Sequence, residues 1–465
     1  MFALTGSYID HYQLTTAQVY FLRKKSKDRA IFDYFFRKIP FNGGYAVFAG
    51  LDNLLNAIEK FHFDEIDEKY FKELKYHSNF INYLKNFRFN GTVYSVLEGE
   101  IVFPFCPLVI IEANLIEAQL IETILLNILN FQTLIATKAS RIRRIAGNCQ
   151  LFDCGLRRSQ GLGGYHASRA SIIGGFNSTS NVSIGRDYQV PVFGTMTHSF
   201  VQSYKKESDA FRDFFSIWPK SCLFLLDTYN TLYSGIPNAI KVAKEIEKTG
   251  KKLMGVRLDS GDLFYLGKKV RYALNIAGLD YIKIAVSNQL NEYVIKDLLD
   301  KKIPIDIFGV GTDLVIGYPD AALDGVYKLS FLNCNPSIKY SDDIYKKNFP
   351  YKKQVYRVLD KNGYFLGADV ISLSEEHKVS VMHHPFNNKK SLFIDKYDQK
   401  PLLHKVMEKG RRLFSSKELV DISKYSSKRL EFLPNKYKCL FRPSVYKVGL
   451  SDILKKKFNK ILSLI

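Results

Sequence analysis

The sequence KLMGVRLDSGDLFYLGKKVRYALNIAGLDYIKIAVSNQ, residues 252–289, decides the fold class of this chain. It begins with a short apolar run that ends in the polar cluster RLDSGD, and apolar residues at helical spacing follow. Gly278 lies where that helix would end, and a second apolar run, YIKIAV, ends in SNQ. A strand, a helix and a further strand form the repeating unit of a parallel sheet. We therefore predict an α/β fold.

The same pattern continues on both sides of this stretch. The run SCLFLL ends in DTYNT, and the run IDIFGV ends in GTD. The polar clusters begin at Asp227, Arg257 and Ser287, at intervals of 30 residues, and then at Gly311, 24 residues further on. Because parallel strands end at one edge of a sheet or one mouth of a barrel, we expect these side chains to converge on one site. The alternative is a set of unrelated loops in an α/β domain.

The composition is that of a folded protein, because 46% of the residues are hydrophobic and 14% are aromatic. The most apolar segment, residues 115–141, is interrupted by Glu117 and Glu122, so it predicts a buried helix and not a membrane span. The amino terminus lacks the pattern of a secretory signal. The six cysteines contain no CxxC pair, which favours free thiols and no zinc site. We expect a soluble, cytoplasmic protein.

The net charge is +21, and residues 331–465 carry 28 basic and 13 acidic residues. Such an excess is typical of proteins that bind nucleic acid, an anionic membrane or polyphosphate, and it is also typical of a solvated lysine-rich surface. The last residues predict an amphipathic basic helix from Leu450, which suits docking better than membrane anchoring. The residues alone leave open whether the two flanks, up to about 115 and from about 330, form one domain or two.

Four short motifs contain candidate ligands for an anionic substrate. GVRLDSGD, residues 255–262, offers Arg257 with two carboxylates, and GVGT, residues 309–312, offers glycines and a hydroxyl. FDCGLRRSQG contains Arg157 beside a second arginine, and FGTMTHSF contains His198 among hydroxyls. The chain has neither the Walker nor the Rossmann glycine pattern, so we expect a phosphate-bearing ligand held by another framework. By itself, a single loop histidine is either structural or functional.

Several motifs, in order along the chain, resemble the nicotinate phosphoribosyltransferase family. They are IDHYQLTTAQVYF, IPFNGGYAVFAGLDNLL, EGEIVFPFCPLVIIEANLIEAQLIETILLNILNFQTLIATKASRI, FDCGLRRSQG, VPVFGTMTHSF, LLDTYNTLYSGIPNAI, GVRLDSGDL and GVGT. The resemblance implies an irregular type II phosphoribosyltransferase α/β barrel and an open-faced α/β domain built from both chain ends. Residues 1–115 and 331–465 would form the open-faced domain, the latter with the basic C-terminal helix, and residues 116–330 the barrel with its active site.

The resemblance also implies a reaction. Nicotinate, phosphoribosyl pyrophosphate, ATP and water would give nicotinate mononucleotide, pyrophosphate, ADP and phosphate, in NAD salvage and with Mg²⁺. The protein would be a homodimer with its active site near the subunit boundary. Two alternatives use the same chemistry on nicotinamide or on quinolinate. A third, from another class, is a basic nucleic-acid-binding protein without activity.

The site residues implied by the resemblance fall into three groups. The catalytic group contains His198 as a phosphohistidine, with Asp227 and Asp259 to position ribose hydroxyls or Mg²⁺. The nicotinate-binding group contains Tyr12, which stacks on the pyridine ring, with Thr195, Arg257 and Arg157. Arg257 or Arg157 would bind the carboxylate. The group that binds phosphoribosyl pyrophosphate contains Gly311, Thr312 and Ser287, and no metal ligand is certain.

Overall fold

The chain forms two compact units in a computed structural model that describes residues 5–341, 343 and 346–464. The first unit contains residues 1–137 and 322–465, and the second contains residues 138–321. The segment boundaries expected from the sequence, after residues 115 and 330, stay a prediction. The first unit is therefore assembled from both ends of the chain, as expected for the open-faced domain.

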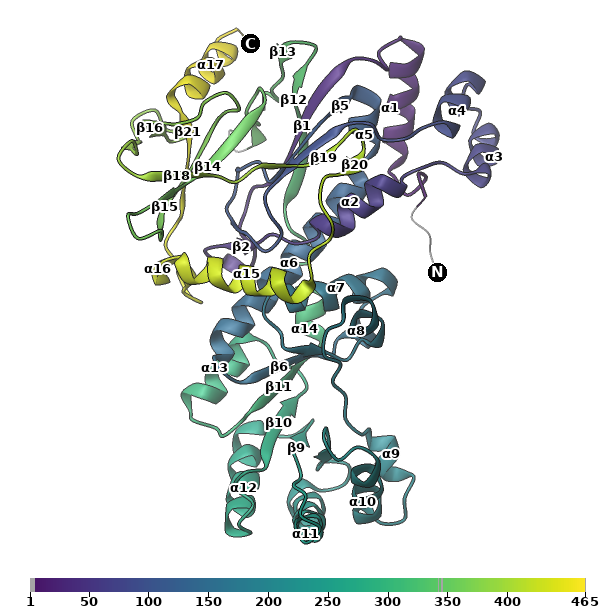
Figure 1. The fold of residues 1–465 in the computed structure, drawn as a ribbon, viewed down its shortest axis with the longest axis vertical. Coiled ribbons are helices and arrows are strands. Elements are labelled where there is room, and N and C mark those ends of the chain that lie inside the picture. The colour runs from purple at the N-terminus through teal and green to yellow at the C-terminus, as the bar shows by residue number, and fades with distance from the viewer. Residues whose placement is uncertain (1–4, 342, 344–345, 465) are drawn as a thin grey trace. The chain divides into compact units, whose positions relative to one another are not determined.

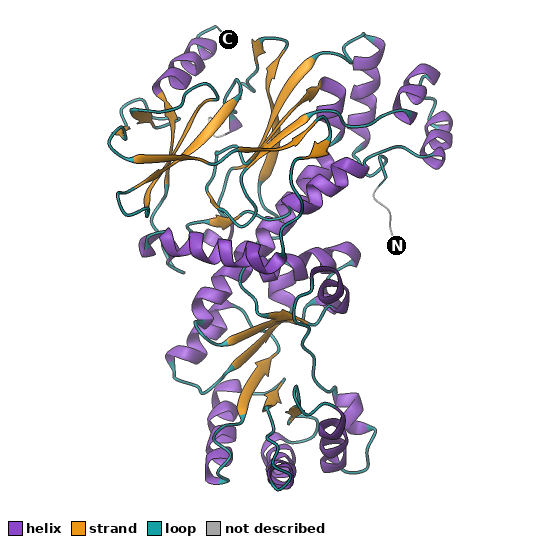
Figure 2. Ribbon diagram, viewed as in Figure 1, coloured by secondary structure: helices purple, strands orange, loops and turns teal. Residues whose placement is uncertain are grey.

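The second unit is built around a six-stranded sheet in which every paired strand is parallel. Its strands, in spatial order, are β7 (Ser178–Thr179), β6 (Gln150–Asp153), β11 (Ile307–Val310), β10 (Lys283–Ser287), β9 (Gly255–Leu258) and β8 (Leu223–Leu225). Helices precede, connect and follow these strands (Figure 2): α7 (Gly161–Ile173), α8 (Val182–Tyr188), α9 (His198–Gln202), α10 (Glu207–Ile217), α11 (Ile236–Glu247), α12 (Leu263–Ile276), α13 (Glu292–Asp300) and α14 (Thr312–Val315). This arrangement confirms the predicted parallel α/β architecture.

Local sequence signals explain these elements. The strands β8 and β11 are buried throughout, which fits continuous apolar runs in a sheet that is covered by helices. Asp262 caps α12 by accepting a hydrogen bond from the amide of Phe264 at 2.9 Å. The predicted bounds of one strand were wrong: the apolar run at residues 252–256 was expected to form the strand, which lies at Gly255–Leu258 (β9). Parallel pairing of Gly255 with its neighbours in β8 and β10 moves Arg257 into the strand itself.

The first unit contains two larger sheets. The seven-stranded sheet is antiparallel and has the order β13 (Asn335–Pro336), β12 (Gly325–Leu332), β1 (Arg29–Phe36), β5 (Val109–Asn114), β3 (Thr92–Ser95), β19 (His404–Glu408) and β20 (Arg411–Arg412). The six-stranded sheet is mixed and has the order β17 (Ser391–Phe393), β16 (Val381–His383), β21 (Lys447–Ser451), β15 (Phe365–Leu373), β14 (Lys353–Leu359) and β18 (Asp398–Pro401). Pairing of β1 with β12 joins the two chain ends (Figure 1).

The remaining elements of this unit are mostly helices. They are α1 (His11–Leu22), α2 (Leu51–Lys60), α3 (Glu65–Glu73), α4 (Ser78–Lys85), α5 (Leu115–Leu120), α15 (Leu419–Phe432), α16 (Asn435–Lys438) and α17 (Asp452–Leu462), with the small strand pair β2 (Ala46–Val47) and β4 (Ile101–Val102). The boundary between the units falls within α6 (Glu122–Ala146). None of the described helices is long and apolar enough to cross a membrane.

Two helix predictions need correction. The helix expected over residues 115–141 is interrupted at Ile121, so it forms α5 and α6. The C-terminal helix begins at Asp452 and not at Leu450, because Leu450 is fully buried in β21 and pairs with Ile371 of β15. Ser451 then caps the helix by accepting a hydrogen bond from the amide of Leu454 at 3.2 Å.

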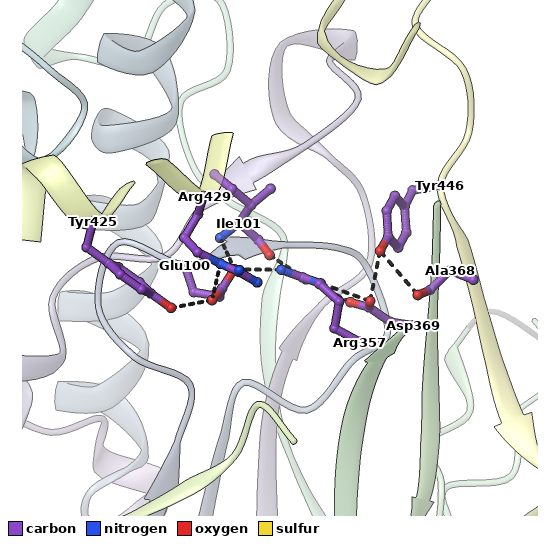
Figure 3. A network of polar contacts seen from close by, with 8 residues as sticks. All are labelled: Glu100, Ile101, Arg357, Ala368, Asp369, Tyr425, Arg429 and Tyr446. Carbon is purple, nitrogen blue, oxygen red and sulfur yellow. Dashed lines mark hydrogen bonds and ion pairs between the residues drawn. The ribbon is translucent and has the colours of Figure 1, made fainter. Parts of the chain in front are cut away.

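A buried ionic network lies inside the first unit and also joins its two chain segments (Figure 3). The fully buried Arg357 donates to Glu100 at 2.6 Å and, through its Nη2 atom, to Asp369 at 2.8 Å. Arg429 also donates to Glu100, at 2.9 Å, and the Tyr446 hydroxyl donates to Asp369 at 2.9 Å. Burial alone would raise the pKa of Glu100, but Arg357 and Arg429 hold this pKa below its ordinary value. The charged form of Glu100 is therefore stabilised by its two arginine partners.

Replacing Arg357 by methionine is expected to destabilise the first unit by about 3–5 kcal/mol, because it leaves buried carboxylates without a cation they need. Urea unfolding followed by circular dichroism measures the loss. The control is Lys456→Ala, which removes an ion pair with Asp452 whose lysine side chain is 77% exposed, and which should cost about 0–1 kcal/mol. Similar losses for both variants would contradict the expected weight of the network.

Candidate active site

The polar clusters at the ends of four strands meet along one edge of the parallel sheet. Arg257 of β9 is paired in register with Leu225 of β8 and with Ala285 of β10. Ser287 is the last residue of β10, and Gly311 follows β11 directly. The convergence predicted from the 30-residue spacing is therefore present in the fold.

Arg257 is the centre of a hydrogen-bonded cluster at this edge. Its Nε atom donates to the Ser287 hydroxyl at 2.9 Å, and its Nη1 atom donates to the Thr195 hydroxyl at 2.8 Å. Its Nη2 atom forms an ion pair with Asp259 at 2.7 Å. The arginine side chain is only 16% exposed, so three partners fix a largely buried guanidinium in one orientation.

Asp259 links the arginine to the histidine. Its Oδ1 atom accepts hydrogen bonds from Arg257 and from the Ser287 hydroxyl, and its Oδ2 atom lies 3.7 Å from Nε2 of His198. Burial would raise the pKa of Asp259, but Arg257 and the Ser287 hydroxyl lower this pKa below its ordinary value. The carboxylate thus adds stability above the unfolded-state pKa of an aspartate, and this contribution disappears only as the pH falls through the depressed folded value.

His198 is held at the start of α9 by its neighbours on both sides. Its Nδ1 atom lies 3.2 Å from the Thr228 hydroxyl, and Thr197 caps the helix by accepting from the amide of Phe200 at 3.2 Å. The imidazole is 41% exposed, which leaves it accessible to a substrate. A positioned, accessible imidazole between a hydroxyl and a carboxylate is suited to nucleophilic or proton-transfer chemistry.

Among the described residues, only one of the two carboxylate oxygens of Asp227 has a hydrogen-bond partner. Its Oδ2 atom accepts from the amide of Asp259 at 3.2 Å and from the Ser260 hydroxyl. Its Oδ1 atom is buried and has no hydrogen-bond partner among the described residues. An unsatisfied buried oxygen next to a cluster of this kind is a candidate ligand for a cation or a substrate hydroxyl.

Three predicted site residues of the second unit lie outside this hydrogen-bonded cluster. Arg157 is exposed in the short turn η2 (Leu156–Arg158), which follows β6. Gly311 and the exposed Thr312 lie at the start of α14, and a Cβ atom at Gly311 would come within 3.5 Å of the Cys154 sulfur. These residues therefore belong to turns that follow β6 and β11, which are neighbouring strands.

Tyr12 belongs to the other unit, where it lies in α1. Its side chain is 52% exposed, and its pKa is raised by partial burial and by Glu122. Its role at the site therefore stays a prediction. No group of three or more potential metal ligands of the histidine, cysteine or carboxylate type occurs among the residues that the structure describes.

Sequence reasoning did not single out two polar residues of the quoted motifs. Thr228, the hydroxyl partner of His198, directly follows Asp227, and the tripeptide DTY was the only signal for it. Asp153 is fully buried at the end of β6, and the motif FDCGLRRSQG drew attention to its arginines instead.

Comparison with known proteins decides the family. The model of the nicotinate phosphoribosyltransferase (NAPRTase) family matches residues 149–390, and models of the N-terminal and C-terminal domains of nicotinate phosphoribosyltransferase match residues 8–130 and 352–458. The chain belongs to the nicotinate phosphoribosyltransferase family. Among its relatives, the nicotinate phosphoribosyltransferase of Bacillus subtilis is 41% identical over 95% of this chain and 92% of its own length. That of Caenorhabditis elegans is 33% identical over 96% and 91%.

Solved structures agree with this assignment. The crystal structure of human nicotinic acid phosphoribosyltransferase superimposes with a TM-score of 0.87 at 28% identity, and the match covers 97% of this chain and 99% of the human one. A nicotinate-nucleotide pyrophosphorylase from Pyrococcus furiosus shares the fold, with a TM-score of 0.73 at 23% identity over 92% and 95% of the two chains. The type II phosphoribosyltransferase fold and the enzyme class are thus confirmed. The nicotinamide, quinolinate and nucleic-acid-binding alternatives are not favoured.

Proposed function

We propose that this nicotinate phosphoribosyltransferase family member joins nicotinate to the ribose of phosphoribosyl pyrophosphate and couples the reaction to ATP hydrolysis in NAD salvage. The observation that carries the proposal is the guanidinium of Arg257, held by Asp259, Ser287 and Thr195 at the ends of the parallel strands. A fixed guanidinium binds a carboxylate through two parallel hydrogen bonds. Nicotinate has this carboxylate, and nicotinamide lacks it.

The transfer of the ribose to nicotinate needs no nucleophile from the protein, because the pyridine nitrogen itself attacks. The lone pair of the pyridine nitrogen forms a bond to C1 of the ribose, while the bond from C1 to pyrophosphate breaks and its electron pair leaves with pyrophosphate. Positive charge develops on the ribose during this exchange. The carboxylate of Asp227 accepts from the backbone amide of Asp259 at 3.2 Å, so the two residues are neighbours, and their carboxylates would stabilise that charge.

His198 would couple ATP hydrolysis to this reaction. A ring nitrogen attacks the γ-phosphorus of ATP, ADP leaves with the electron pair of the broken bond, and water later releases phosphate from the imidazole. The contacts with Thr228 at 3.2 Å and with Asp259 at 3.7 Å support the role, because they orient the ring. Negative charge on the ring would also alter its interaction with Asp259.

Mg²⁺ fits the residues that are present. The buried Oδ1 atom of Asp227 has no hydrogen-bond partner among the described residues, and an oxygen ligand of this kind suits a hard cation. Mg²⁺ is commonly bound through one or two carboxylates together with substrate phosphates, so it needs no cage made of protein ligands alone. When bound, the ion would supply positive charge that favours the departure of pyrophosphate.

Replacing Asp227 by asparagine is expected to weaken Mg²⁺ binding about tenfold or more, because the carboxylate that would bind the ion loses its charge. Calorimetric titration of Mg²⁺ into the protein with phosphoribosyl pyrophosphate measures the affinity without turnover. Ser260→Ala is the control: it removes the hydroxyl that donates to Asp227 but keeps the carboxylate, so it should change the affinity less than threefold. Equal Mg²⁺ affinity in the wild type and Asp227→Asn would exclude this residue as a ligand.

The remaining roles belong to the same proposal. Gly311 and Thr312 begin a helix after a strand, and the backbone amides of such a turn suit a phosphate. Ser287 supports Arg257 and would contact phosphoribosyl pyrophosphate, and Arg157 would provide a further cation near the carboxylate. Tyr12 would stack on the pyridine ring, and the enzyme would act in the cytoplasm as a homodimer with its active site near the interface.

Product formation tests the proposal directly. Nicotinate, nicotinamide and quinolinate are each incubated with phosphoribosyl pyrophosphate and Mg²⁺, with and without ATP, and the mononucleotides are separated by chromatography. We expect nicotinate mononucleotide alone as the main product, in an amount that rises with ATP. A main product from nicotinamide or quinolinate would refute the substrate assignment.

A further inference from the structure

Asp153 is a buried carboxylate that connects turns of the candidate site. It is the last residue of β6, its side chain is fully buried, and its strand lies between β7 and β11. Its Oδ1 atom accepts from the amide of Gly155 at 2.9 Å, and its Oδ2 atom accepts from the Thr179 hydroxyl at 2.8 Å. Burial raises the pKa of Asp153, and hydrogen bonds from Ser168, Gly155 and Thr179 oppose this rise. The side chain therefore serves as an acceptor for donors that come from both sides.

The bond to Gly155 fixes the turn that carries Arg157. Gly155 begins this turn, and a Cβ atom there would come within 2.1 Å of the Val315 side chain and 3.0 Å of the Gly311 carbonyl oxygen. The turn after β6 is thus packed tightly against the turn after β11. Movement of Gly155 would displace both Arg157 and the predicted phosphate-binding turn.

The bond to Thr179 fixes a different segment. The backbone of Thr179 accepts from the amide of Phe193 at 2.9 Å and donates to the carbonyl of Pro191 at 3.2 Å. Residues 191–197 lead from this pairing to Thr195, which contacts Arg257, and to His198. The position of Thr179 therefore influences the positions of the Thr195 hydroxyl and of His198.

We propose that Asp153 is a positioning residue that holds two parts of the site in place: the Arg157 turn through Gly155, and residues 191–197 through Thr179. It touches no substrate in this role. The inference rests on the proposed function, because it assigns the two held segments to substrate binding. It differs from a purely structural role in one respect: the bond through Oδ2 should affect the constants for nicotinate and ATP, whereas the bond through Oδ1 should also affect the KM for phosphoribosyl pyrophosphate, because the Gly155 turn packs against Gly311.

Selective variants separate these effects. Thr179→Val removes the hydroxyl that donates to Asp153 and accepts from the amide of Asn181, and it leaves the bond from Gly155 to Asp153 in place. It should therefore raise the KM for nicotinate about tenfold and reduce the stimulation by ATP, while the KM for phosphoribosyl pyrophosphate stays within about twofold. Asp153→Ala releases both segments, so it should raise both KM values about tenfold or more. Thr179→Ser keeps the hydroxyl and should restore wild-type constants. Asp306→Asn is the matched control, because Asp306 accepts from the amide of Ile284 at the opposite end of the strands.

Amide hydrogen exchange provides a measurement that does not depend on turnover. Thr179→Val should accelerate exchange in residues 191–197 and leave residues 154–158 unchanged, whereas Asp153→Ala should accelerate exchange in both segments. If the wild type makes no nicotinate mononucleotide, the proposed function fails, and the exchange pattern still decides the positioning role. If the wild type is active but Thr179→Val lowers only the melting temperature, with unchanged constants and exchange, the role of Asp153 is structural and the inference is wrong. A rise in both KM values for Thr179→Val would also overturn it.

Discussion

Replacing His198 by alanine is expected to abolish the increase in nicotinate mononucleotide formation that ATP causes. His198 provides the imidazole of the cluster. Its neighbours Thr228 and Asp259 contact it through oxygen atoms and provide no ring nitrogen. A phosphoryl group from ATP therefore has no equivalent acceptor in the variant. Turnover without ATP should continue at the basal rate, because the bond exchange at the ribose does not use the histidine.

Two measurements check this result. Initial rates with and without ATP give the stimulation, and incubation with ATP labelled in the γ-phosphate should label the wild type in a form that is stable in base and lost in acid. The variant should remain unlabelled. His377→Ala is the matched control, because His377 is an exposed histidine in the first unit. Retention of the ATP effect in His198→Ala would remove the phosphohistidine from the proposed function.

Replacing Arg257 by lysine is expected to raise the KM for nicotinate about 10–100-fold. A charge-assisted hydrogen bond contributes about 1.5–3 kcal/mol, and each 1.4 kcal/mol corresponds to a factor of about ten in affinity. Lysine keeps the positive charge but lacks the planar fork, so it cannot serve Ser287, Thr195 and a substrate carboxylate together. The KM for phosphoribosyl pyrophosphate should change much less.

The discrimination between substrates provides the sharper test of this role. Since nicotinamide has no carboxylate, the variant should lose preference for nicotinate over nicotinamide by a similar factor. Arg271→Lys is the control, because Arg271 donates to the carbonyl oxygen of Asp280 at 2.9 Å and does not contact the cluster. If Arg257→Lys raised the KM for nicotinate and the KM for nicotinamide equally, the arginine would not be the group that selects the carboxylate.

Much of the architecture follows from local sequence. Over residues 221–318, apolar runs of strand length alternate with segments that have apolar residues at helical spacing. This periodicity predicts parallel strands connected by helices. The polar residues at strand ends were also predictable, because parallel strands bring their carboxyl ends to one edge. Exact boundaries were less accessible, as the shift of β9 to Gly255–Leu258 shows, since register depends on pairing with neighbouring strands.

By itself, the sequence determined the parallel α/β class and the identity of the residues at the strand ends, because these are properties of local spacing, and its ordered motifs carried the resemblance to the family. Only the tertiary structure decided which partners those residues have. Arg257 contacts Asp259 of its own motif, but its contacts with Thr195 and Ser287 come from segments that are distant in the sequence. Asp153 likewise lies in a motif noted for its arginines, yet its function arises from Thr179, 26 residues away. Hydrogen bonds between distant segments depend on packing in three dimensions, and periodicity along the chain contains no record of them.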